Sequence, residues 1–79
     1  MTFSGNVYRD GRFWLAEIPA LHAMTQGRTR KEALAMAANW LETMVNREGF
    51  RAEVCPRKGG RFEISGNDTG AMIALSNVR

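Results

Sequence analysis

The sequence predicts an α+β domain in which one main helix packs on one face of a small antiparallel sheet, in the order β-β-β-α-β-β. Three observations support this fold class. The chain has 79 residues, enough for one domain. Apolar and polar residues alternate before and after the middle of the chain, as in half-buried strands. In the middle, apolar residues recur every three or four positions, as along one face of a helix.

The first two strands are expected to form a hairpin around Asp10-Gly11, between Val7-Tyr8-Arg9 and the run from Phe13 to Ile18. Asp-Gly supplies the positive φ values that a tight turn requires. Side chains alternate across a strand, so the second strand presents one set to each face. One set is Trp14, Ala16 and Ile18, and the other is Phe13, Leu15 and Glu17. Because Glu17 belongs to the second set, that face is expected to be open and partly apolar.

Pro19 ends the second strand, because proline cannot donate to the ladder. A short third strand is expected near residues 23–26, and Gly27 then breaks the chain. Thr29 and Glu32 have the spacing of a capping box, in which the threonine hydroxyl accepts from the glutamate amide and the carboxylate returns the bond. These residues could instead form a polar binding loop with Thr25 and Gln26, but the structural interpretation is favoured.

The helix is expected to run from about residue 30 to 47, with Gly49 in a left-handed conformation just past its end. Its buried face is predicted to consist of Ala33, Leu34, Ala37, Leu41, Met44 and Val45. Met36 and Trp40 widen the apolar arc beyond what one small sheet needs.

Two further strands are expected after the helix, from alternation over residues 50–55 and again over 61–64, with a hairpin at Lys58-Gly59-Gly60. Ser65-Gly66-Asn67 is expected to close the folded part. We therefore divide the chain into a domain of residues 1–66 and a C-terminal tail of residues 67–79, the start of a linker or of an oligomerisation helix. The tail is apolar on every side at Met72, Ile73 and Leu75.

Composition excludes several classes of site. Cys55 is the only cysteine and His22 the only histidine, so we expect no internal disulfide, no metal centre and no cofactor. A lone cysteine, no signal-peptide pattern and no long apolar run indicate a cytoplasmic protein that does not enter a membrane. The only aspartates are Asp10, in a turn, and Asp68, in the tail, so the clustered carboxylates of a two-metal nuclease are missing. We therefore expect no catalytic residues and no enzyme activity.

The formal charge of +3 is spread evenly along the chain. Arg57, Lys58 and Arg61 form the one dense basic cluster. They are possible phosphate contacts, although three charges around Gly-Gly are usually a solvated turn.

Several motifs together resemble the HicB antitoxin family. The segment Thr25-Gln26-Gly27-Arg28-Thr29, followed by Glu32-Ala33-Leu34, is similar to the family signature T-Q-G-x-T-x-x-E-A-L, which follows a strand ending in a proline, here Pro19. Gly49-Phe50, the Gly-Gly hairpin and Arg61-Phe62-Glu63-Ile64-Ser65 are also similar. The resemblance extends from about Tyr8 to Leu75.

The resemblance implies a partial RNase-H-like or β-β-β-α-β fold that binds a small HicA-like ribonuclease toxin and covers its catalytic histidine. Longer members continue into a segment that binds the promoter of their own operon, and this chain ends where that segment would begin.

The residues themselves predict a partner, because one helix covers only one face of a sheet. We expect a toxin or homo-oligomer interface that includes Phe13, Leu15, Met36, Trp40, Met72, Ile73 and Leu75. The leading hypothesis is a non-enzymatic antitoxin that is a homodimer or larger. The alternative is a stand-alone dimeric nucleic-acid-binding regulator that aligns its basic hairpins.

Overall fold

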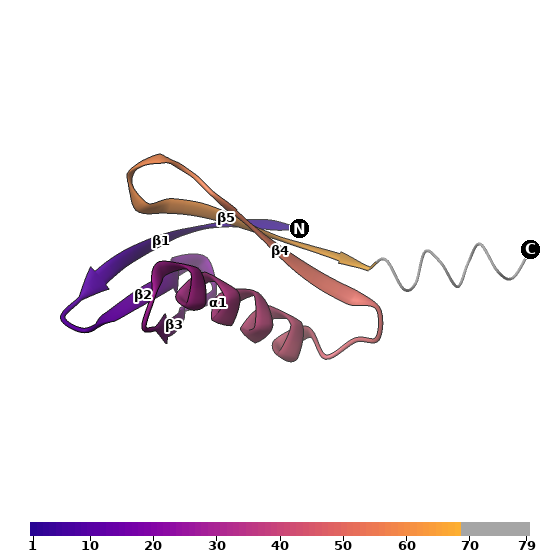
Figure 1. Ribbon diagram of the computed structural model, residues 1–79. Helices are drawn as coiled ribbons and strands as arrows, with labels where there is room; N and C mark the ends of the chain where they lie inside the picture. The colour runs from indigo at the N-terminus through magenta and orange to yellow at the C-terminus, as the bar shows by residue number, and fades with distance from the viewer. Residues whose placement is uncertain (69–79) are drawn as a thin grey trace, which may run out of the picture.

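The computed structural model describes residues 1–68, in which one α-helix lies against a five-stranded antiparallel sheet (Figure 1). The elements in chain order are β1 (Thr2–Asp10), β2 (Phe13–Ile18), the 3-10 turn η1 (Pro19–Leu21), β3 (Ala23–Gly27), α1 (Arg30–Val45), β4 (Phe50–Pro56), the 3-10 turn η2 (Lys58–Gly60) and β5 (Arg61–Asp68). The predicted fold class and element order are confirmed. No helix in this part of the chain is long and apolar enough to cross a membrane.

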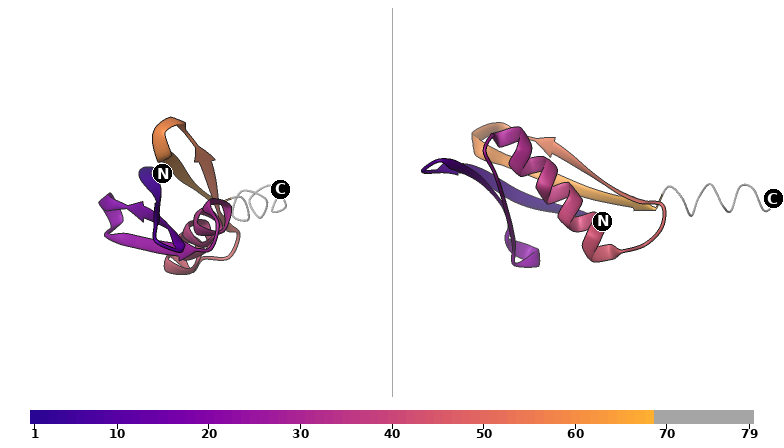
Figure 2. Two further views of the ribbon diagram at one scale, coloured as in Figure 1. Left: turned by 60° about the vertical axis from the view of Figure 1, so that its left-hand side comes forward. Right: turned by 60° about the horizontal axis from the view of Figure 1, so that its bottom comes forward.

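The strand order in the sheet is β3-β2-β1-β5-β4, so the first strand of the chain is the central one. Every neighbouring pair is antiparallel. The sheet is strongly twisted, and α1 lies across one of its faces in both views of Figure 2. β3 and β4 are the two edge strands, and α1 contacts both of them. The helix therefore covers the sheet from one edge to the other.

The core lies between α1 and the sheet. Its buried side chains come from the helix and from all five strands: Val7, Ala16, Ile18, Ala23, Ala33, Leu34, Ala37, Leu41, Phe50, Phe62 and Ile64. The two phenylalanines are the largest of them. Burying a phenylalanine stabilises a fold by about 1.5–3 kcal/mol, so these rings carry a large share of the stability of a small domain.

Two glycines make room for these rings. A Cβ atom on Gly5 would lie 2.3 Å from the Phe62 ring, and one on Gly66 would lie 2.3 Å from the Phe50 ring. Gly5 is directly opposite Phe62 across β1 and β5. Each ring thus covers a bare stretch of backbone, which compensates for the low strand propensity of glycine.

The same glycines explain where the strand predictions are wrong. The first strand is predicted at Val7-Tyr8-Arg9, and the end of the folded part at Ser65-Gly66-Asn67. In the structure β1 already starts at Thr2 and contains Ser4-Gly5-Asn6, and β5 continues to Asp68, beyond residue 66. The two strands pair with each other from Thr2 opposite Ser65 to Asn6 opposite Arg61. Pairing in the sheet overrides the local turn preference of these residues.

The helix begins as predicted and ends earlier. Thr29 caps its N-terminus by accepting a hydrogen bond from the Glu32 amide at 3.0 Å. At the other end Asn46 is the left-handed C-cap residue, with φ of 48°, and its N–H donates to the Glu42 carbonyl. Gly49 also has a positive φ, of 83°, as predicted, but the helix has already ended three residues earlier. Asparagine tolerates this conformation better than most residues, so it stops the helix before Gly49.

Gly27 has a different role from the predicted one. It is the last residue of β3 rather than a chain break. A Cβ atom on Gly27 would lie 2.6 Å from the Ala33 amide nitrogen, so the glycine lets the first turn of α1 approach the strand closely.

Candidate functional site

We call the face of the sheet opposite α1 the open face, because no described element covers it. The burial pattern identifies it strand by strand. On β2, Ala16 and Ile18 are buried against the helix, whereas Phe13 is exposed on the other side. On β5, Phe62 and Ile64 are buried, and Glu63 between them points to the open face. The predicted division of the second strand into a covered and an open set is confirmed.

Four apolar side chains gather at one end of the open face. We call them the open-face patch: Tyr8, Phe13, Leu15 and Met24. Tyr8 of β1 pairs directly with Leu15 of β2, and Phe13 is two residues before Leu15 on the same strand. Met24 of β3 lies opposite Glu17 of β2. Tyr8 is 39% exposed, Phe13 41% and Met24 52%, and Leu15 is half-buried. A cluster of this kind on an uncovered sheet is typical of an interaction site.

The residues that we predicted as one interface lie in two layers. Phe13 and Leu15 are in the open-face patch. Met36, 46% exposed, and the half-buried Trp40 are on α1, which packs against the other face of the sheet. The sheet separates the two pairs, because side chains on neighbouring positions of β2 point to opposite faces. The remaining predicted members, Met72, Ile73 and Leu75, lie outside the described residues.

Sequence reasoning missed Tyr8 and Met24. The hairpin loop consists of Gly11, with φ of 63°, and Arg12, one residue later than Asp10-Gly11. A two-residue loop sets the register on both sides, so Tyr8 opposite Leu15 follows from the loop position alone. Met24 has no such signal, because its register depends on the shape of η1, where His22 is left-handed with φ of 51°.

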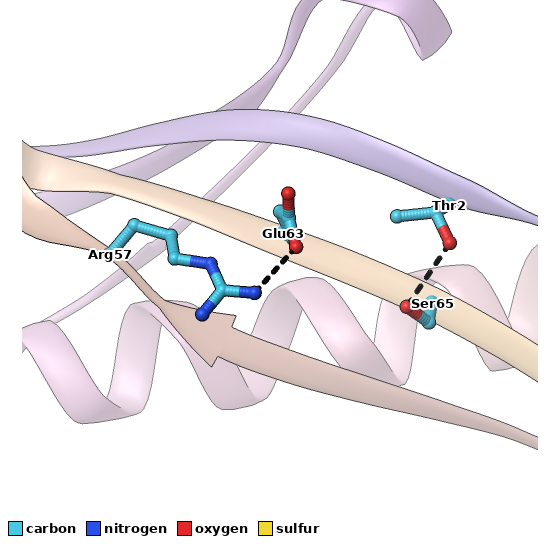
Figure 3. Close-up of polar contacts among 4 residues, drawn as sticks. All are labelled: Thr2, Arg57, Glu63 and Ser65. Atoms are coloured by element: carbon cyan, nitrogen blue, oxygen red, sulfur yellow. Dashed lines mark hydrogen bonds and ion pairs between the residues drawn. The ribbon is translucent and has the colours of Figure 1, made fainter.

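The other end of the open face is polar. The Thr2 and Ser65 hydroxyls are 3.3 Å apart, and Arg57 Nη2 donates to Glu63 Oε1 at 2.8 Å (Figure 3). Both pairs are on the same side of β5. The Arg57 and Glu63 side chains are 56% and 43% exposed, so solvent screens their ion pair. The hydrogen bond from Arg57 and the charge of Glu63 raise the pKa of the arginine above its ordinary value.

A groove of about 820 Å³ lies at this polar end. Its polar lining is Thr2, Ser4, Asn6, Arg57, Lys58, Arg61 and Glu63, and Pro19 and Ala20 of η1 also border it. The structure thus brings the three residues predicted as phosphate contacts to one concavity. Glu63, the one carboxylate in this lining, is already paired with Arg57.

The family-motif residues mainly build the junction between β3 and α1. The Thr25 hydroxyl donates to the Ala33 carbonyl at 3.0 Å. The Glu32 carboxylate accepts from the Arg28 amide at 2.9 Å, one residue before the expected partner. These bonds support the structural interpretation of the motif. Gln26 differs, because it is exposed on the open face directly opposite Leu15.

A second carboxylate ties the helix to an edge strand. Glu42 Oε2 accepts from the Ala52 amide of β4 at 2.9 Å. This bond occupies a donor on the strand edge and joins α1 to the far side of the sheet.

Residues with catalytic or metal-binding potential are sparse in the described part of the chain. His22 follows η1 and Cys55 is on β4, and both are exposed. Among residues 1–68, no group of three or more histidine, cysteine, aspartate or glutamate side chains is arranged to hold a metal ion.

The fold and these two surfaces define an α+β domain with an apolar patch and a basic groove on one open sheet face. Comparisons of the chain with known protein families, curated proteins and solved structures found no match.

Proposed function

We propose that the chain is the non-enzymatic antitoxin of a HicAB-type pair, and that it binds and covers a small mRNA-cleaving ribonuclease toxin through the open-face patch. The observation that carries this proposal is the cluster of Tyr8, Phe13, Leu15 and Met24 on a sheet face without a cover. The proposal of the HicB family rests on the resemblance of the motif around Thr25 to Glu32. The patch is the surface proposed to bind the partner.

The chemistry of the patch supports a protein partner. Aromatic residues and methionine are enriched at the centres of protein interfaces, and the patch contains two aromatic rings and one methionine. Two carboxylates stand directly across from patch residues, Asp10 opposite Phe13 and Glu17 opposite Met24. These carboxylates offer ion pairs to a basic ribonuclease, although Arg9 and Arg12 are exposed on the same hairpin and the whole chain carries a net positive charge.

In this proposal the protein acts in the cytoplasm as a homodimer or larger oligomer, and the apolar tail at Met72, Ile73 and Leu75 contributes to assembly. The helix edge at Met36 and Trp40 is a further contact for a second chain. The toxin docks on the sheet.

A pull-down from the native cell tests the toxin assignment. The wild-type chain should capture a small basic protein that cleaves RNA when it is freed and stops cleaving when the chain is added back. The variant Phe13→Ser should inhibit much less, because it places a polar group at the centre of the contact. Met44→Ser is the matched control, since Met44 is also exposed but lies on the helix, outside both proposed contacts.

Three results would count against the proposal: capture of no ribonuclease, full inhibition by Phe13→Ser, or loss of inhibition by Met44→Ser alone. The last result would move the toxin contact from the sheet to the helix.

A second function is favoured by the groove that Arg57, Lys58 and Arg61 share. It is the alternative of a dimeric regulator that binds nucleic acid. Salt dependence separates the two functions. Contacts with phosphates weaken steeply as salt rises, whereas an apolar protein contact changes little.

A further inference from the structure

The groove at the polar end of the open face is lined by cationic side chains that are not all in ion pairs. Three cationic side chains line it, and the ion pair with Glu63 engages only Arg57. The side chains of Lys58 and Arg61 are exposed and make no hydrogen bond or ion pair with any described residue. The sequence places both beside Gly59 and Gly60, and in the fold both line the groove together with residues 2–6 of β1. Two free cations at one concavity attract a ligand with more than one negative charge.

The floor of the groove is formed by β1 and β5, which pair from Thr2 to Asn6. The pairing of β1 with β2 begins only at Asn6, and beside residues 2–5 the groove is bordered by Pro19 and Ala20 of η1. The hydroxyls of Thr2 and Ser4 and the amide of Asn6 are in its lining. Hydroxyl and amide groups beside Lys and Arg are the usual contacts of a phosphodiester backbone.

The shape of the open face favours a single strand over a duplex. Sequence readers of duplex DNA insert a helix or a two-stranded ribbon into the major groove. Here α1 is on the opposite face of the sheet (Figure 2). The open face has a groove at its polar end. Tyr8 is the next residue of β1 after Asn6 on this face and is 39% exposed, so it offers a stacking surface at the end of the groove. A positive groove ending in an exposed aromatic ring is typical of single-strand binding.

We propose that this groove binds the phosphodiester backbone of single-stranded nucleic acid, with Lys58 and Arg61 as its phosphate contacts and Tyr8 as a stacking platform. The inference deepens the second function above, because it names the ligand and requires no dimer. It does not depend on the antitoxin function, although Tyr8 belongs to both sites, because Lys58 and Arg61 lie outside the open-face patch.

Fluorescence anisotropy with the full chain tests the groove. The probes are a labelled single strand of about ten nucleotides as RNA and as DNA, the same sequence as a duplex, and a polyglutamate peptide. The test variant is Lys58→Ala with Arg61→Ala. The matched control is Arg28→Ala with Arg30→Ala, which removes two exposed cations beside α1, on the other side of the sheet. Thermal unfolding checks that both variants fold.

The wild-type chain should bind the single strand, as RNA, DNA or both, more tightly than the duplex. The test variant should weaken binding on the order of tenfold and reduce the slope of log affinity against log salt by about 1.4, for two lost phosphate contacts. Glu63→Gln should tighten binding, because it frees Arg57 from its ion pair. Tyr8→Ala should weaken binding without changing the salt slope, since stacking releases no counterions.

The inference is overturned if neither strand binds at low salt, if the control variant weakens binding as much as the test variant, or if the polyglutamate peptide binds in preference to the oligonucleotide. Unchanged or weaker binding by Glu63→Gln would also contradict it. None of these results bears on inhibition of a ribonuclease, so failure of the groove and failure of the antitoxin function are distinguishable.

Discussion

The two faces of the sheet are built from the same strands and have opposite characters. On the face under α1, Val7, Ala16 and Ile64 are at most 3% exposed. On the open face, Tyr8 and Phe13 alternate with these residues and are about 40% exposed. Because side chains alternate between the two faces along each strand, neighbouring residues serve either stability or binding. Substitutions on the covered face should change stability, and those on the open face should change binding.

The largest expected effect is that of Phe62→Ala, on the covered face. Phe62 is 1% exposed, and removal of a buried phenylalanine side chain costs about 3–5 kcal/mol. A core of this size supplies roughly 3–5 kcal/mol in total, so the variant should lose its cooperative unfolding transition in urea. A variant that unfolds within about 1 kcal/mol of the wild type would show that the covered face does not carry the stability.

Gly5→Ala should have the next largest effect. The new methyl group would lie 2.3 Å from the Phe62 ring and 2.6 Å from the Glu17 carbonyl oxygen, so the ring must move. Overpacking of this kind costs about 1–3 kcal/mol, measurable as a lower urea midpoint. Phe62→Leu in the same chain should recover part of the loss, because it shortens the clashing side chain. Additive losses in the double variant would contradict the close packing of Gly5 and Phe62.

Thr29→Ala tests the motif at the start of α1. Loss of the cap should cost about 1 kcal/mol of unfolding free energy and leave partner binding unchanged. Thr43→Ala is the control, because the Thr43 hydroxyl donates to the Asn39 carbonyl inside the same helix and caps nothing. Its expected change is near zero. If Thr29→Ala lost binding at unchanged stability, the motif would be part of the binding site.

Phe13→Ser should have the smallest effect on stability, within about 0.5 kcal/mol, as at other exposed sites. Its loss should appear in partner binding instead, measured by titration of the freed toxin. A drop in the urea midpoint as large as that of Gly5→Ala would mean that the open face is part of the core and would remove the distinction between the faces.

Local patterns predict most of this fold. Alternation over residues 13–18 identifies both faces of β2, and the capping residues Thr29 and Glu32 locate the start of α1. The ends of β1 and β5 escape prediction, because Gly5 and Gly66 favour turns locally and are held in strands by rings that are distant in sequence. The packing of these rings on the glycines is visible only in the three-dimensional structure.

The candidate site is less predictable than the fold. Phe13 and Leu15 follow from alternation, and Tyr8 follows from the hairpin register. The basic groove does not, because it combines η2 with the first half of β1, more than fifty residues away in the chain. Met36 and Trp40 lie on α1, on the other side of the sheet from the open-face patch. Helical periodicity shows that they are apolar but does not show which side of the sheet a second chain would contact.

Methionine methyl NMR tests the central claim, that the open face docks the partner, most directly. Met24 is on the open face, whereas Met36 and Met44 are exposed on α1, so one spectrum monitors both sides of the molecule. When the freed toxin is titrated into the labelled chain, we predict that the Met24 methyl signal shifts and broadens while those of Met36 and Met44 stay in place. Shifts at Met36 and Met44 with an unchanged Met24 signal would contradict the claim.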